Sequence, residues 1–367
     1  MRAALALTLT TLGLTVGPIA VPVAHSAASR TVDRRIQDSR ITESSGLAAS
    51  TLHPGVLWTH NDSGNPPRIY AIAKNGSTAA TLTLLAEPNV DWEAIAITRG
   101  TTGQALIAVA DTGDNNAVRS SVRIALVEEP QKLRTASVTP VHVLRLRYPD
   151  GPRDAEALLA DPRTGRLYLV SKNLFGSELF AVPKRVWPNP PAGSDRVSPV
   201  TKLTKVASMS AGLITDGTFL PNGRMLLRGY GKVFVMDRPE AVENRRIATL
   251  ADARLPSQDQ GESITVTNGG RQALIGSEGR REPVLRIPVP AVPDDSGTSG
   301  SSATLPPDPA ATTPAGSAAI KAGSQTSQEP RFVGVGNLRV WILVIGGALA
   351  VVALTVGALR LRLRAHR

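Results

Sequence analysis

The 367-residue sequence predicts an all-β repeat protein, and its internal repetition is the first observation behind that prediction. Five segments each begin with a polar residue and continue into an apolar run, at intervals of roughly 45 to 65 residues. They are "ESSGLAAS", "DWEAIAIT", "DAEALLAD", "ITDGTFLP" and "QGESITVT", aligned at Ser45, Glu93, Glu156, Asp216 and Glu262. Periods of this size are typical of chains that repeat one supersecondary unit.

Short strands separated by turns are the second observation. Each segment is followed by a turn rich in Pro, Gly and Asn and by a second apolar run, such as "RLYLVSKN" or "RMLLRGYG". A third run follows in every repeat, and a fourth in the first four, as in "VTPVHVLRLRYP" and "VTKLTKVASM". The pattern predicts a β-propeller of four-stranded blades. We expect five blades, or six if the long second or third repeat contains a degenerate one.

The third observation concerns the missing strand of the last repeat. The fifth repeat has no fourth run, and an unpaired sheet edge there would promote aggregation. The segment "RTVDRRIQD", Arg30 to Asp38, precedes the first repeat and has no blade of its own. We therefore expect it to close the ring as the outer strand of the last blade.

The two ends of the chain predict a membrane-anchored, exported protein. Residues 1–28 have the basic start, apolar stretch and small-residue site of a secretory signal peptide; the alternative is an N-terminal anchor. Residues 291–331 are rich in Ser, Thr, Pro, Gly and Ala, which predicts a disordered stalk after a propeller ectodomain at 30–290. Residues 338–359 predict a transmembrane helix, and the arginine-rich tail 360–367 predicts a cytoplasmic C-terminus with the propeller outside the cell.

The amino-acid composition excludes some kinds of site and limits the kinds of partner. With no cysteine, the chain has no disulfide, thiolate metal site or cysteine nucleophile. A net charge of +11 favours anionic partners such as wall polymers, phosphates or lipid surfaces. Because the chain is exported and only 4% aromatic, we expect no nucleic acid among its partners, but an extracellular ligand, polymer or protein.

Polar residues are expected to gather at one opening of the propeller. The first strand of each blade lines the central channel and the second runs antiparallel to it, so strand-one starts and strand-two ends share a face. The starts supply Glu43, Ser45, Asp91, Glu93, Asp154, Glu156, Asp216 and Glu262. The ends supply Asn61, Asp62, Asp111, Asp114, Asn115, Lys172, Asn173, Arg228 and Glu278.

So many carboxylates in one ring would repel each other unless a cation lies among them, and Ca²⁺ takes six to eight oxygen ligands. The candidate metal ligands are Asp62, Asp91, Glu93, Asp111, Asp114, Asp154, Glu156, Asp216 and Glu262. For the loops "HNDSGN" and "DTGDNN", the alternative is that Asp and Asn cap turns by bonding their own backbone. The candidates for catalytic roles are His60, Lys172 and Arg228, and no nucleophile elbow or phosphate-binding glycine loop is present.

Several short motifs resemble known propeller families. "DPRTGRLYLVSKN" and "LPNGRMLLRGYGKVFVMD" resemble blades of exported bacterial WD-like and NHL-like propellers. "GESI", "DAEAL" and "SEG" are similar to motifs of calcium-dependent phytase, esterase-like-phytase and lactonase propellers. That resemblance implies Ca²⁺ held by Glu93, Glu156, Asp216 and Glu262. A phytase would also need a cluster of basic residues that binds phosphate. The candidates for it are Lys172 and Arg228, together with Arg68 and Arg119.

Two functions follow as hypotheses. The first is a membrane-anchored extracellular binding module whose acidic channel face ligates a cation. The second is a calcium-dependent hydrolase of phosphate esters or lactones, using water activated at the ion. A hydrolase should show a tight cluster of three or four carboxylates beside a basic residue or histidine in a concave pocket. A binding module should show carboxylates spread round the rim.

Overall fold

The computed structural model describes residues 30–188, 193 and 195–293, all within one compact unit, Met1–Gly300. The predicted signal peptide, most of the stalk, the transmembrane helix and the basic tail lie outside the described residues. Within the described part of the chain, no helix is long and apolar enough to span a bilayer. The same part of the chain contains a short 3-10 segment, η1 (Asn268–Gly270).

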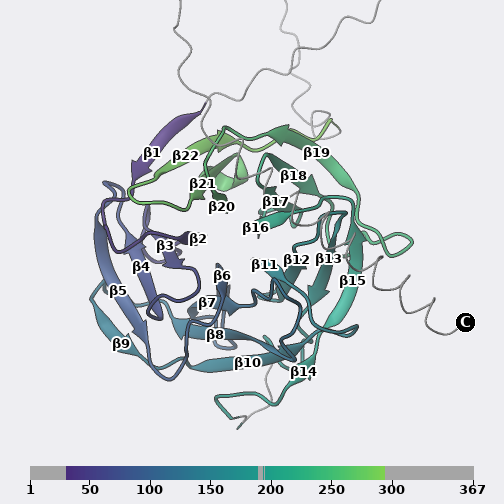
Figure 1. The fold of residues 1–367 in the computed structure, drawn as a ribbon, viewed down its shortest axis with the longest axis horizontal. Helices are drawn as coiled ribbons and strands as arrows, with labels where there is room; N and C mark the ends of the chain where they lie inside the picture. Colours follow the sequence, from purple (N-terminus) through teal and green to yellow (C-terminus); the bar gives the residue numbers. More distant parts are fainter. Residues whose placement is uncertain (1–29, 189–192, 194, 294–367) are drawn as a thin grey trace, which may run out of the picture. The chain divides into compact units, whose positions relative to one another are not determined.

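The described residues form a ring of five sheets, each with four antiparallel strands, and this is the five-bladed propeller that the repeats predict (Figure 1). Blade 1 contains β2 (Ser44–Ala49), β3 (Leu57–Asn61), β4 (Arg68–Ile72), β5 (Thr78–Leu84) and β9 (Ala136–Val138). Blade 2 contains β6 (Trp92–Arg99), β7 (Ala105–Asp111), β8 (Val122–Glu128), β10 (His142–Arg147) and β14 (Thr201–Lys202). Blade 3 contains β11 (Ala155–Ala160), β12 (Leu167–Ser171), β13 (Ser177–Ala181) and β15 (Thr204–Met209). Blade 4 contains β16 (Ile214–Phe219), β17 (Met225–Gly229), β18 (Lys232–Met236) and β19 (Thr249–Arg254). Blade 5 contains β20 (Gly261–Thr267), β21 (Gln272–Ser277), β22 (Pro283–Pro288) and β1 (Thr31–Arg35).

The ring closes as predicted, by the N-terminal strand. Strand β1 pairs antiparallel with β22, from Thr31 opposite Arg286 to Arg35 opposite Pro283, and the two lie side by side in Figure 1. Arg34 of β1 is buried and reaches into blade 1, where its Nη1 donates to the carbonyls of Gly55 (2.7 Å) and Ile72 (3.1 Å). One strand therefore completes the last blade and ties it to the first.

The extra length of the second and third repeats does not form a sixth blade. Strand β9 instead pairs in parallel with β5 of blade 1, and β14 pairs in parallel with β10 of blade 2. The run "VTKLTKVASM", expected as one strand, is therefore split: Thr201–Lys202 joins blade 2, and Thr204–Met209 is the outer strand of blade 3. Each added strand covers the outer edge of the preceding blade.

Five hydrophobic clusters fill the spaces between neighbouring blades, one for each pair. In the middle strands β3, β12 and β17 every residue is buried, because both faces of the sheet pack against another blade. This explains why β12 and β17 are apolar over most of their length instead of alternating. In β3 the buried residues also include the polar Thr59, His60 and Asn61.

Glycines end the first turn of every blade. The turns between the first and second strands finish at Gly55, Gly103, Gly165, Gly223 and Gly270, each with φ between +69° and +85°. Side chains disfavour this left-handed conformation, so the turn chemistry of the sequence fixes the hairpins that alternate around the ring.

Ring closure gives a testable prediction. We expect Arg34→Ala to lower the free energy of unfolding by about 2 kcal/mol or more, because two buried carbonyls lose a charged donor and buried Asp33 loses a partner. Urea unfolding of the full-length chain measures the change. The matched control is Arg35→Ala, whose guanidinium is exposed and bonds only the Arg281 carbonyl (2.9 Å). Equal losses in the two variants would contradict the closing role of Arg34.

Candidate metal centre at the channel mouth

A β-bulge at the start of each channel-lining strand positions the candidate side chains. The pairing of β2, β6, β11, β16 and β20 with the second strand of each blade is interrupted within their first residues. A bulge re-aims the extra residue and leaves it outside the ladder. The residues within these interruptions include Ser45, Glu93, Glu156, Thr215 and Glu262.

The strand starts and the strand ends meet on one face, as the sequence predicts. The backbone N–H of Asp62, after β3, donates to the Glu43 carbonyl before β2 (3.0 Å). The same bond joins Lys172 to Asp154 in blade 3 (3.0 Å) and Glu278 to Gln260 in blade 5 (2.9 Å). These bonds hold the second-strand ends against the first-strand starts around the opening of the channel.

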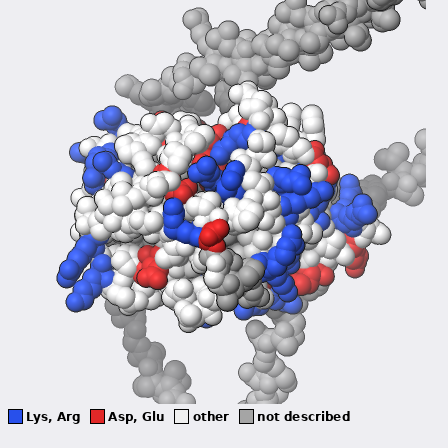
Figure 2. Space-filling view, turned by 90° about the horizontal axis from the view of Figure 1, so that it is seen from below, with Lys and Arg blue, Asp and Glu red and all other residues white. Residues whose placement is uncertain are grey.

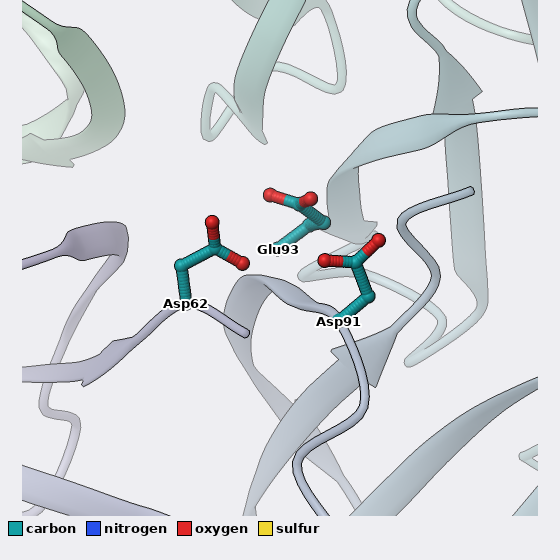
Figure 3. Close-up of side chains that lie close together, drawn as sticks. All are labelled: Asp62, Asp91 and Glu93. Atoms are coloured by element: carbon teal, nitrogen blue, oxygen red, sulfur yellow. The ribbon is translucent and has the colours of Figure 1, made fainter. Parts of the chain in front are cut away.

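Five carboxylates from three blades converge there. Carboxylate oxygens of Asp62, Asp91 and Glu93 all lie within 4.8 Å of one another, as do those of Glu93, Asp154 and Glu156. Figure 3 shows the Asp62, Asp91 and Glu93 side chains pointing toward one another. Ca²⁺ binds oxygen at 2.3–2.6 Å, so two ligands of one ion lie at most about 5 Å apart. Either group therefore has the spacing that one cation requires.

Gly113 leaves room for this cluster. A Cβ atom at this position would lie 2.4 Å from Asp91 Oδ2 and 2.5 Å from Glu93 Oε1. Any side chain would therefore displace the two carboxylates. The Ser45 hydroxyl holds Glu93 from the other side, donating to the Glu93 carbonyl oxygen (2.9 Å) and to Oε2 (3.2 Å).

Burial and mutual repulsion make the ionised cluster unfavourable without a counter-charge. Burial, then the neighbouring carboxylates led by Glu156, raise the pKa of Glu93 far above its usual range. Burial and the charges of Asp62 and Asp154 raise the pKa of Asp91 to about 6. Burial also raises the pKa of Asp154, despite a backbone hydrogen bond from Asp114. A bound divalent cation would favour the ionised forms of all of them.

Lys172 supplies one positive charge to the cluster. Its Nζ forms an ion pair with Glu156 and lies 5.2 Å from the ring centre of Tyr230. Burial opposes the charge of the lysine, but the Glu156 carboxylate outweighs burial and raises the pKa of Lys172. Burial still keeps the pKa of Glu156 above its usual range. One ammonium group therefore offsets only part of the negative charge.

The predicted position of Asp216 is wrong by one residue. Thr215 occupies the bulge of β16, and Asp216 pairs with Arg228 in the regular ladder that follows. Its carboxylate is buried and accepts backbone N–H groups of Gly217 (2.7 Å) and Ile264 (2.7 Å). Asp216 is therefore placed as a structural acceptor between blades 4 and 5. A one-residue slip reverses the face of a strand residue.

His60 and Arg228 do not lie at the mouth. His60 is fully buried against the edge of Trp92, with ring centres 5.8 Å apart, and burial lowers its pKa to about 4. Arg228 is also fully buried, and its Nη1 donates to the carbonyls of Ser263 (2.9 Å) and Gly276 (2.7 Å). Both positions correct the expectation that these side chains face a ligand: one packs in a core and the other joins blades 4 and 5.

In the loop "DTGDNN", the contacts favour the turn-capping interpretation over metal ligation. Asp114 caps its own loop, since its two carboxylate oxygens accept the N–H groups of Val118 (2.9 Å) and Arg119 (2.8 Å). Asp111 pairs with the Arg119 guanidinium (2.8 Å) and accepts the Asp91 N–H (3.2 Å). These two carboxylates therefore support the loop that carries Gly113 and do not join either group of converging oxygens.

The remaining candidates lie around this centre. Glu262 and Glu278 of blade 5 are close enough that the charge of Glu262 raises the pKa of Glu278; with burial as the larger cause, that pKa is about 7. Glu43 accepts the Asn65 amide (2.5 Å), whereas Arg68 begins β4, two strands out from the channel. Sequence reasoning missed Gly113 and Tyr230. Gly113 has no side chain that would mark it as a functional residue. Tyr230 directly follows the second strand of blade 4, and the other blades have no tyrosine at this place, so the repeats do not point to it.

Comparisons with known proteins identify no family for this chain, and the solved structures that it resembles are distant. No family model and no curated protein matches the sequence. Among solved structures, a proposed oxidoreductase (glucose dehydrogenase) from Thermus thermophilus is 13% identical, with a TM-score of 0.39 over 71% of this chain and 100% of that one. A gluconolactonase from Xanthomonas campestris is 13% identical, with a TM-score of 0.37 over 72% and 91%. The propeller of Dos1 is 11% identical, with a TM-score of 0.34 over 65% and 57%.

The raised pKa of Glu262 predicts a pH-dependent stability. Burial raises this pKa from 4.5 to about 7, so between these values the folded chain holds a proton that the unfolded chain has released. Stability from this group is therefore lost as the pH rises from 5 to 8. The wild type should lose this stability as the pH rises, whereas Glu262→Gln has no such group to ionise. We therefore expect the free energy of unfolding of Glu262→Gln to rise by roughly 2 kcal/mol relative to the wild type between pH 5 and pH 8.

Urea unfolding of the full-length chain in EDTA, at pH 5 to 8, tests this expectation. Glu240→Gln is the control, since its side chain is 58% exposed, and it should follow the wild type at every pH. A constant difference between Glu262→Gln and the wild type would show that Glu262 ionises normally.

Proposed function

We propose that this propeller binds a divalent cation of the calcium type at its channel mouth and presents the loaded face to an extracellular ligand. The carrying observation is the convergence of carboxylates from three blades in two groups that share Glu93. Asp62, Asp91 and Glu93 have the spacing of one ion's ligands, and so do Glu93, Asp154 and Glu156. The donor set is all carboxylate, which suits a hard cation. Gly113 also keeps the space that the ligands occupy free of a side chain.

The proposed setting is the outer surface of a cell membrane. It rests on the apolar run at 338–359, the arginines that follow it, and the signal-like N-terminus, all read from the sequence. In this proposal the propeller stands on a Ser/Thr/Pro-rich stalk, with its C-terminus in the cytoplasm. Its partner is a soluble ligand, a polymer or another protein at the cell surface.

Thermal unfolding of the full-length chain with Ca²⁺ and with EDTA tests the cation site. A cation that binds only the folded state should add about 2.7 kcal/mol of stability at 100 times its Kd. We expect Glu93→Gln and Gly113→Ala to lose this gain, because one removes a ligand and the other displaces Asp91 and Glu93. No gain in the wild type with any divalent cation would refute the site.

Two controls separate the cation from general effects. Glu240→Gln removes an exposed carboxylate and should keep the full gain. Gly231→Ala adds a Cβ where no atom lies within 4 Å, so it should also respond to Ca²⁺ like the wild type.

A metal-dependent hydrolase is the second candidate, and the position of Lys172 favours it. The carboxylates form a tight cluster beside a basic residue, which is two of the three features expected of a hydrolase, the third being a concave pocket. A bound cation would supply Lewis acidity and an activated water. Lys172 remains protonated, so it can hold the anionic group of a phosphate ester or donate a hydrogen bond to the carbonyl oxygen of a lactone.

Hydrolysis of phosphomonoesters and lactones by the full-length chain with Ca²⁺ tests this second candidate. If the activity exists, Lys172→Met should lower kcat/KM by roughly a hundredfold, the loss of one charged contact to the transition state. Lys232→Met is the control, because Lys232 pairs with Asp252 (2.8 Å) at half-exposed positions. If the chain binds the cation but hydrolyses neither substrate class, the hydrolase candidate is refuted and the binding function is the one that remains.

A further inference from the structure

Blade 2 carries a row of basic side chains on one face of its outer strands. Arg145 on β10 lies directly opposite Arg123 on β8, and Arg147 lies opposite Lys202 on β14. Residues two apart on a strand point to the same face, so all four side chains share one face of the blade. We call Arg123, Arg145, Arg147 and Lys202 the arginine row. The other face of the same strands is apolar and packs against blade 3.

Too few acids accompany this row to neutralise it. Arg123 Nη1 lies 3.3 Å from Glu87 Oε2, and Arg196 Nη1, from the segment beside β10, lies 3.8 Å from Glu87 Oε1. Arg145, Arg147 and Lys202 have no ion-pair partner among the described residues. Arg145 Nε is buried and has no hydrogen-bond acceptor within the part of the chain that the structure describes.

Both features are unfavourable unless a ligand is present. Like charges directly opposite each other on neighbouring strands destabilise a sheet. A buried guanidinium nitrogen without an acceptor also costs free energy. Figure 2 views the molecule from the side of β10 and β14, and several separate groups of Lys and Arg side chains are visible on that face, with Asp and Glu side chains between them. Arg123 and Arg196 keep 40% and 39% of their side chains exposed, so a ligand can reach them from solvent.

We propose that the arginine row, together with Arg196, binds an oxyanion of the phosphate type. Guanidinium forks match the oxygen geometry of phosphate, and the pairing is stronger than a neutral hydrogen bond. A single carboxylate would offset only one of the surplus charges, whereas a phosphate group offsets nearly two and offers more acceptor oxygens. The arginine row lies on the outer strands β8, β10 and β14, whereas the carboxylate cluster lies at the ends of the inner strands. Asp111, which lies between Trp92 and Arg123 in the blade, pairs with Arg119.

Calorimetric titration of the full-length chain in EDTA tests this proposal, because the chelator keeps divalent cations from the channel mouth. A negative result in this titration would therefore refute the anion site without bearing on the proposed cation site. Three probes distinguish the source of the phosphate: inorganic phosphate, linear polyphosphate, and vesicles of phosphatidylcholine with or without phosphatidylglycerol. Tighter binding of polyphosphate than of phosphate would support a polymer, and binding only to the phosphatidylglycerol vesicles would support a lipid headgroup.

We expect Arg145→Gln to weaken binding of the preferred probe about tenfold and Arg145→Lys to weaken it less, since lysine keeps the charge but not the fork. Arg238→Gln, an exposed arginine of blade 4, is the matched control and should bind as the wild type does. Arg145 Nε has no partner to lose, so unfolding midpoints should confirm that both variants fold. No binding of any probe by the wild type, or equal binding by Arg145→Gln, would overturn the proposal.

Discussion

The closure of the ring is the constraint on which the rest of this structure depends. Each blade buries both of its faces against its neighbours, so an open ring would expose two apolar faces and two sheet edges at once. The pairing of β1 with β22 prevents this, and Arg34 carries the closure into blade 1. Without cysteine in the chain, burial and hydrogen bonding alone hold the ends together.

The closed ring brings unfavourable charges together and holds them there. Channel-lining strands converge on a small opening, and the bulge at each strand start turns polar side chains toward it. Carboxylates that would be solvated on an isolated strand become buried beside one another, which raises their pKa values. The rigidity of the scaffold therefore preserves an arrangement that the carboxylates would not adopt by themselves, a property typical of functional sites.

Blade 2 is asymmetric in charge from the channel to the rim. Its inner strand begins with Asp91 and Glu93, its second strand ends with Asp111 paired to Arg119, and its outer strands carry Arg123 and Arg145. Blade 2 thus contributes Asp91 and Glu93 to the carboxylate cluster, which blades 1 and 3 complete, and carries the arginine row on its outer strands. A cation at the first and an anion at the second would each relieve repulsion that the fold itself imposes.

The sequence by itself determined the propeller class, the five repeats, the closing strand and the side of the ring where the carboxylates gather. Strand periodicity, turn glycines and the missing fourth strand are local features, so they can be read along the chain. Only the tertiary structure decided which polar residues meet. Asp216 lies one residue beyond its bulge, His60 and Arg228 are buried between blades, and β9 and β14 join the blades that precede them. The physical reason is that register and burial depend on partner strands far apart in the chain, and a shift of one residue moves a side chain from the channel face to the opposite face.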